Sequence, residues 1–153
     1  LGALNILVCN NLPEKEKALA EFYQMYENDD LVLNKWFAVQ TRNPAQNTLE
    51  VTKKLLSHPK FDYKNPNKVR GVLGAFSGNL GSFHTKEGYE FYAKECLKID
   101  KINPHLAARL FTSFSKYLKF DEATKEAAKV VLSAVAKEDS LSGVSRETVE
   151  RLI

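Results

Sequence analysis

Apolar residues recur at helical spacing along almost the whole chain. Val69, Val72, Leu73 and Phe76 stand at i, i+3, i+4 and i+7, which places them on one face of an α-helix. The same spacing predicts the following further inward-facing stripes: Leu19, Phe22, Tyr23, Tyr26; Val32, Leu33, Trp36, Phe37, Val39; Leu49, Val51, Leu55, Leu56; Tyr89, Tyr92, Ala93, Cys96, Leu97; Leu106, Leu110, Phe114, Tyr117, Leu118; and Ala127, Val130, Val131, Ala134, Val135.

Start signals precede these stripes. Asn65-Pro66 and Asn103-Pro104 each supply an asparagine as N-cap and a proline in the first helical turn. The other predicted starts are Pro13, Asp29 with Asp30 in the first turn, Asn43-Pro44, Asp121, and Ser145 as N-cap of a last helix over 145–153. The helix after Asn43-Pro44 should end near Ser57, because Pro59 disfavours helical backbone at His58.

The pattern therefore predicts an all-α fold of about eight short helices, with no convincing strand. Each helix is amphipathic and too short to be stable alone in water. Antiparallel pairs stacked side by side would bury all the stripes. The Asn-Pro pairs at 43, 65 and 103 are unevenly spaced. We therefore expect an irregular HEAT/armadillo-like superhelix, forming a single helical domain over residues 1–153.

Glycines mark two unusual places. Gly71 and Gly74 lie inside a predicted helix, where they would let a neighbouring helix come close. Residues 77–88 are predicted to form a glycine-rich loop, which is long for a connection between packed helices. Functional loops have this composition, but so do plain surface excursions, and both interpretations stay open.

The bulk composition narrows the classes of partner. The 153 residues are 44% hydrophobic and carry a net charge of +3, without a basic cluster, so the pattern is not that of a nucleic-acid binder. No apolar run is long enough for a membrane span, and the N-terminus lacks the basic start of a signal peptide. Cys9 and Cys96 match no metal spacing, which favours a reducing compartment. Because the chain opens without methionine and its start reads as the middle of a helix, we expect it to come from a longer protein.

The chain shows no residues arranged for catalysis or for metal binding. His58, His84 and His105 are far from one another in sequence, whereas a helical zinc site needs two histidines four residues apart. We interpret each of the three as structural or solvated. Cys96 lies within an apolar stripe and should be a buried, unreactive thiol.

Two arginines flank apolar stripes, Arg70 beside Val69 and Arg109 beside Leu110. One interpretation is a solvated helix face or a local ion pair. The other is a positive group directed at an anionic partner, such as a carboxylate. Composition leaves both open.

Between residues 35 and 110 the chain contains a series of short motifs, and both the motifs and the order in which they follow one another are informative. The motifs are Lys35-Trp36-Phe37-Ala38-Val39-Gln40, Leu55-Leu56-Ser57-His58-Pro59-Lys60-Phe61, Asn65-Pro66-Asn67-Lys68-Val69-Arg70, Gly74-Ala75-Phe76, Phe83-His84, Gly88-Tyr89, Leu97-Lys98-Ile99-Asp100 and Asn103-Pro104-His105-Leu106-Ala107-Ala108-Arg109-Leu110. From about Leu31 onward the chain resembles the C-terminal helical domain of bacterial-type aminopeptidase N. The flanks, 1–30 and 120–153, match in helical character more than in motif.

The resemblance implies that the chain is part of the C-terminal domain of a multi-domain zinc aminopeptidase, a cytoplasmic hydrolase that removes N-terminal residues from peptides. The family's His-Glu-x-x-His zinc motif is absent from these 153 residues, so zinc would belong to the parent's catalytic domain and this chain alone would not be an enzyme. The helical domain would pack on that catalytic domain, cover its chamber and gate the entry of peptides.

By the same resemblance, Arg70 and Arg109 are the residues that would reach the chamber and bind peptide. The stretch 77–84 departs from the family pattern, so contacts made there by relatives are not carried over. A second hypothesis, from the solenoid-like pattern alone, is a stand-alone helical scaffold for protein–protein interaction.

Overall fold

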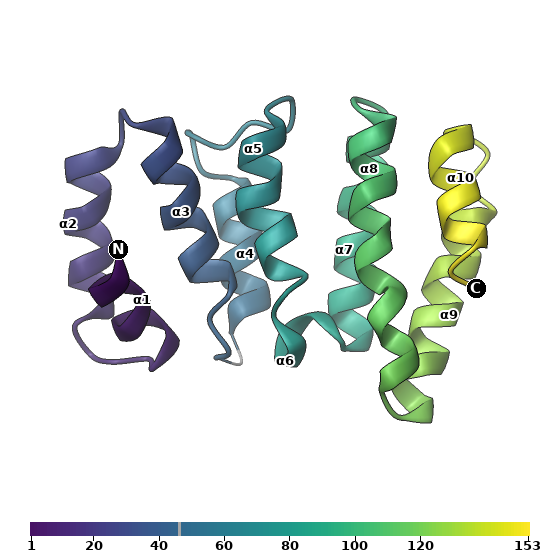
Figure 1. The fold of residues 1–153 in the computed structure, drawn as a ribbon, viewed down its shortest axis with the longest axis horizontal. Helices are drawn as coiled ribbons and strands as arrows, with labels where there is room; N and C mark the ends of the chain where they lie inside the picture. Colours follow the sequence, from purple (N-terminus) through teal and green to yellow (C-terminus); the bar gives the residue numbers. More distant parts are fainter. Residues whose placement is uncertain (46) are drawn as a thin grey trace. The chain divides into compact units, whose positions relative to one another are not determined.

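A computed structural model describes residues 1–45 and 47–153. These residues form α-helices, one π-helical segment and one 3-10 segment, and they contain no strand (Figure 1). The elements are α1 (Gly2–Cys9), α2 (Lys15–Tyr26), α3 (Asp30–Thr41), α4 (Thr48–Leu56), α5 (Pro66–Val69), η1 (Arg70–Gly74), α6 (Leu80–Phe83), α7 (Lys86–Asp100), α8 (Pro104–Phe111), η2 (Thr112–Lys119), α9 (Glu122–Ala136) and α10 (Gly143–Glu150). The all-α prediction is confirmed, with a few more short elements than expected. Over the part of the chain that is described, no helix combines the length and the apolar character needed to cross a membrane.

The chain divides into two compact units, Leu1–Ser82 and Phe83–Ile153. Each unit is described by itself below. The single domain expected from sequence stays a prediction.

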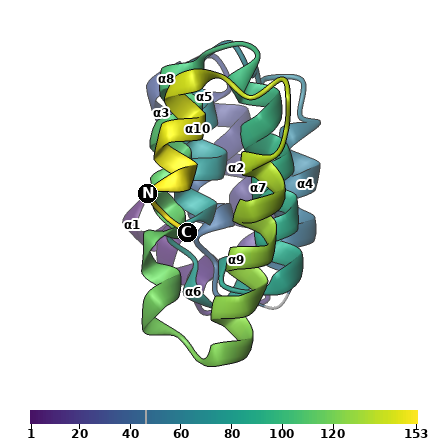
Figure 2. The ribbon, with the colours of Figure 1, turned by 90° about the vertical axis from the view of Figure 1, so that its right-hand side faces the viewer.

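In the first unit α3 is the central helix. It contacts α1, α2, α4, α5 and η1. Helices α1, α3 and α5 form one layer, and α2 and α4 form the other (Figures 1 and 2). The core residues that these helices share are Leu4, Val8, Leu19, Leu33, Trp36, Phe37, Val39, Leu55 and Val72.

Contacts to the aromatic side chains of α3 hold the two layers of the first unit together. Trp36 donates a hydrogen bond from its Nε1 to the carbonyl of Leu19 in α2, over 3.0 Å. The His58 ring lies between aromatic neighbours, with centroids 5.2 Å from Tyr23 and 5.5 Å from Phe37. Its Nδ1 accepts a hydrogen bond from the Lys60 amide, so His58 is a packing residue, as the sequence suggested.

Four of the start signals predicted from sequence are confirmed, whereas the start predicted at Asn43-Pro44 is wrong, because α4 begins at Thr48 with Asn47 in the N-cap position. Asp29 caps α3 by accepting hydrogen bonds from the Leu31 and Val32 amides, and Asn65 caps α5 in the same way. Asn103 caps α8 and Asp121 caps α9. Each cap satisfies amides that have no partner inside the helix.

The last helix begins earlier than predicted, and Ser145 is not its N-cap. Ser142 caps α10, and Ser145 is fully buried inside the helix. The Ser145 hydroxyl donates a hydrogen bond to the Asp100 carboxylate at 2.6 Å, and Asp100 also accepts from the amide and the hydroxyl of Ser142. A buried carboxylate needs such donors, and this one comes from α7, which only the tertiary fold brings to α10.

In the second unit α7 packs against both α8 and α9, and α10 packs against α8 and α9. The interior is aromatic. Phe83 lies edge-on to Tyr92, Tyr89 and Phe114, with ring centroids 4.9 to 5.6 Å apart, a favoured geometry for aromatic pairs.

Two predicted stripes in the second unit are partly wrong. Leu118 is 61% exposed, because η2 is a 3-10 helix and its period of three residues turns Leu118 away from the face that Phe114 and Tyr117 share. In α9 the buried face is Ala128, Leu132 and Val135, whereas Val130 is 59% exposed. Apolar residues cover two neighbouring faces of α9, and packing on α7 and α10 selects one of them.

The glycine-rich stretch is not one continuous loop. It contains the short helix α6, and α7 begins at Lys86, with Thr85 as its N-cap and Gly88 buried in its first turn. Thr85 accepts the Gly88 amide at 3.0 Å. Asn79, also in this stretch, donates to the carbonyls of Thr41 and Asn43, which ties it to the end of α3.

The helix that starts at Pro66 widens into the π-helical segment η1. A Cβ added at Gly71 would lie 3.0 Å from the backbone oxygen of Asn34 in α3. The prediction that Gly71 lets a helix come close is therefore confirmed. At Gly74 an added Cβ would meet only the Cβ of Arg70, at 3.7 Å, so the same prediction is wrong there.

Replacing Gly71 with alanine should destabilise the first unit by about 1–3 kcal/mol, because the new methyl group forces α3 and η1 apart. Gly74→Ala is the matched control and should be neutral or slightly stabilising, because it removes glycine's backbone entropy without a clash. Urea unfolding followed by circular dichroism measures both. Equal midpoints for the two variants would contradict the close contact.

His84 is buried in the aromatic interior of the second unit. Its Nδ1 and the Tyr89 hydroxyl are hydrogen-bonded at 2.7 Å, and its ring stacks on Phe120 with centroids 4.1 Å apart. Its Nε2 is buried without a partner among the described residues. Burial, and secondarily the charge of Lys116, lowers the pKa of His84 to about 4.

Acid should therefore destabilise the second unit through His84. The unfolded chain, with an ordinary histidine pKa of 6.5, binds more protons than the folded chain between that pH and about 4. The stabilisation is complete above pH 6.5 and declines by on the order of 3 kcal/mol as the pH falls to 4. Thermal unfolding of His84→Gln between pH 7 and 4 should show a shallower decline than wild type. An unchanged slope for His84→Gln would refute this role.

Candidate functional site

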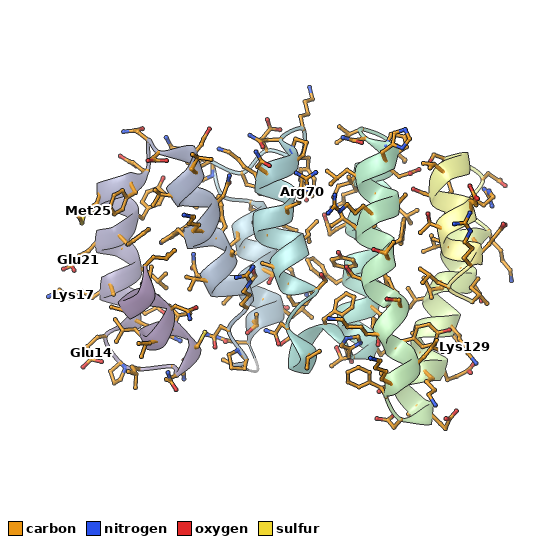
Figure 3. All side chains as sticks on the ribbon, viewed as in Figure 1. Glu14, Lys17, Glu21, Met25, Arg70 and Lys129 are labelled. Carbon is orange, nitrogen blue, oxygen red and sulfur yellow. The ribbon has the colours of Figure 1, made fainter. Side chains whose placement is uncertain are left out.

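Arg70 is the first residue of η1, and its side chain is exposed (Figure 3). Its Nη1 donates a hydrogen bond to Asn67 Oδ1 at 3.2 Å. Asn67 is itself in the first turn of α5, where its amide donates to the capping Asn65 side chain. One hydrogen bond therefore holds the Arg70 guanidinium, while four of its five N–H donors stay available to another group.

Next to this arginine the first unit contains a cavity of about 720 Å³. Its walls come from α1, α3 and the first turn of α5. They are formed by Leu1, Gly2, Asn5, Leu31, Asn34, Lys35, Ala38, Val39, Arg42 and Asn67. Asn67 therefore both bonds Arg70 and lines the cavity.

The cavity wall carries positive charge and no carboxylate. Lys35 in α3 and Arg42, the C-cap residue of α3, have exposed side chains, and within residues 1–45 and 47–153 neither forms an ion pair or a side-chain hydrogen bond. Sequence reasoning did not select these two residues as a site. Their spacing of seven along α3, with Ala38 between them, was the available signal, since it puts them on one face.

Arg109 lies in the last turn of α8, in the second unit, and its side chain is exposed. Its backbone carbonyl accepts the Thr112 hydroxyl at 2.6 Å, at the point where α8 passes into η2. Its guanidinium makes no hydrogen bond or ion pair with any residue that the structure describes. The local-ion-pair interpretation of Arg109 is therefore not supported, and Arg70 bonds only a neutral amide.

Among the described residues, the other candidate groups comprise Cys96 and the three histidines. Cys96 is fully buried, and burial, followed by the charges of Glu95 and Asp100, raises the pKa of its thiol, which opposes formation of a reactive thiolate. Outside residue 46, no three side chains of His, Cys, Asp or Glu are grouped so that they could hold a metal ion. Zinc therefore does not fit the residues present, and no reaction step is assigned to it within this chain.

Three bacterial aminopeptidases match all or nearly all of the chain. Aminopeptidase N of Haemophilus influenzae is 33% identical over all of this chain, and aminopeptidase N of Escherichia coli is 31% identical over all of it. Aminopeptidase N of Caulobacter vibrioides is 34% identical over 93% of the chain. The chain spans only 17–18% of the length of these relatives.

A solved structure shares the fold. The crystal structure of Legionella pneumophila aminopeptidase A in complex with aspartic acid superposes with a TM-score of 0.92 and 34% identity. The match covers 98% of this chain and 18% of that one. The resemblance to aminopeptidase N inferred from the short motifs is thereby confirmed.

A family model described as a domain of unknown function (DUF3458_C) with ARM repeats matches residues 1–153. This match agrees with the irregular armadillo-like stack predicted from the helix pattern. The chain belongs to this family of ARM-repeat domains.

Proposed function

We propose that this chain is the C-terminal helical part of a zinc-dependent aminopeptidase N, in which it covers the active-site chamber and gates the entry of peptides. The observation that carries the proposal is the match of all or nearly all of the chain to relatives named aminopeptidase N, of whose length the chain spans only 17–18%. In the parent enzyme, zinc held by a catalytic domain outside this chain would polarise the scissile carbonyl and activate water. The chain would contribute binding and exclusion, and would pack on that domain.

The exposed arginines suit a peptide ligand. A guanidinium offers planar, paired N–H donors that match a carboxylate or two successive backbone carbonyls. Arg70 is anchored by only one hydrogen bond to Asn67, and Arg109 by none, so both retain donors for a substrate. We assign them the role of binding the C-terminal carboxylate or the carbonyls of a peptide.

In the intact enzyme, Arg70→Ala and Arg109→Ala should each lower kcat/KM for peptides by about 3- to 10-fold, as expected for the loss of a partly exposed charged hydrogen bond. Zinc content and hydrolysis of a single-residue chromogenic substrate should not change, because that substrate does not reach these arginines. Arg151→Ala, at an exposed arginine of the C-cap of α10, is the control. Unchanged peptide kinetics for both variants would refute the proposed role.

The 153-residue chain by itself should bind no stoichiometric zinc and hydrolyse no aminoacyl substrate. Metal analysis and a chromogenic assay of the purified chain measure both. One bound zinc with turnover would overturn the assignment of catalysis to a separate domain.

The alternative function, a stand-alone scaffold for protein partners, rests on the ARM-repeat fold alone. The length of the natural open reading frame discriminates between the two. A long upstream region with a His-Glu-x-x-His motif supports the peptidase, and a frame of only these residues supports the scaffold. A cytoplasmic location stays a prediction from the family resemblance, with which the two cysteines agree.

A further inference from the structure

The wall of the cavity in the first unit carries positive side chains and no negative side chain that would neutralise them. Lys35 and Arg42 supply two positive side chains, and the lining includes no aspartate or glutamate. Elsewhere on this unit, two exposed lysines have carboxylate partners, Lys17 with Glu21 and Lys53 with Glu50. The cavity thus differs from the ordinary mixed surface of the unit, and its charge complements an anion.

The lining also favours an extended, partly apolar ligand over a small inorganic anion. The two cations are seven residues apart on α3, which corresponds to about 10 Å along the helix axis. Between and beside them lie the apolar side chains of Ala38, Val39 and Leu31. A short peptide segment could contact both cations and the apolar surface between them in one extended conformation.

Amide groups complete the match to a peptide. Asn5, Asn34 and Asn67 reach the cavity from α1, α3 and α5. Asparagine can both donate to a backbone carbonyl and accept from a backbone N–H. Asn67 accepts from Arg70 through its Oδ1, which leaves its Nδ2 donors for a ligand and links the cavity to the arginine.

We propose that this cavity binds the carboxylate-bearing part of a peptide substrate, with Lys35 and Arg42 as the carboxylate contacts. The proposal rests on the proposed function and deepens it, because it names a preference for peptides that carry a negative charge beyond the residue being removed. The carboxylate comes either from the peptide's C-terminus or from an acidic side chain, and the two sources share the same recognition chemistry.

The test uses the full-length enzyme and peptides of three to ten residues in matched sets. One set compares glutamate with glutamine at each position after the second residue. The other compares a free C-terminal acid with a C-terminal amide. For wild type we expect kcat/KM to be about 5- to 10-fold higher for the negatively charged member at one or more peptide lengths, through a lower KM, as for one or two partly exposed charge pairs.

Lys35→Ala with Arg42→Ala should abolish this charge preference, so that the negatively charged and the neutral member of each matched pair give the same kcat/KM. The reciprocal exchange Lys35→Arg with Arg42→Lys should retain it, because both charges are kept. Lys17→Ala is the control for net charge, since Lys17 is an exposed cation of α2 in the opposite layer and does not line the cavity (Figure 3). High salt should weaken the preference in wild type and not in the double variant.

If kcat/KM is higher for glutamate peptides but not for peptides with a free C-terminal acid, the acidic side chain is the source of the carboxylate. If it is higher only for peptides with a free C-terminal acid, the C-terminus is the source. No charge preference at any length, or a preference that survives the double variant, would overturn the proposal.

Arg70→Ala separates this failure from failure of the proposed function. If Arg70→Ala slows peptides and the double variant keeps the preference, only the cavity assignment fails. If Arg70→Ala and Arg109→Ala also leave peptide kinetics unchanged, the role in substrate binding fails as a whole.

Discussion

Burial of one central helix holds each unit of this protein together. The longest helices have only 15 residues, so none would persist in water without tertiary contacts. In the first unit α3 supplies that centre, and its Phe37 is fully buried. Fully burying such an aromatic side chain contributes about 1.5–3 kcal/mol, comparable to a sizeable fraction of a domain's net stability. In the second unit α7 has the corresponding role, with Tyr89, Tyr92 and Cys96 all removed from solvent.

This dependence on a central helix leaves the polar side of the same helix free for binding. The apolar face of α3 is occupied by Leu33, Trp36 and Phe37, whereas Lys35 and Arg42 are exposed beside the cavity. The close approach of Gly71 to the Asn34 backbone brings η1 against α3. Arg70, the residue just before Gly71, is therefore held beside the helix that carries the cavity. Packing and the presentation of charge thus follow from the same contact.

The buried polar groups of the second unit serve the fold. Asp100 accepts from Ser142 and Ser145 and so joins α7 to α10. His84 is kept neutral by its surroundings, and burial, followed by the charge of Asp121, raises the pKa of Tyr89 to about 12. None of these groups is placed for proton transfer to a ligand, since each is enclosed by aromatic or helical neighbours. The groups available for recognition are the exposed arginines and lysines on the helix surfaces.

The sequence by itself determined the helical class, most helix starts and the principal core stripes. Those features depend on residues close together in the chain: Asp29, Asn65, Asn103 and Asp121 cap amides two or three positions away. Its motif order also indicated the aminopeptidase resemblance and selected Arg70 and Arg109. Contacts between distant segments were decided only by the tertiary structure. Ser145 bonds Asp100, 45 residues away, and the 3-10 geometry of η2 turns Leu118 outward. The cavity likewise needs α1, α3 and α5 together, because local periodicity specifies which face of a helix is polar but not which polar faces meet.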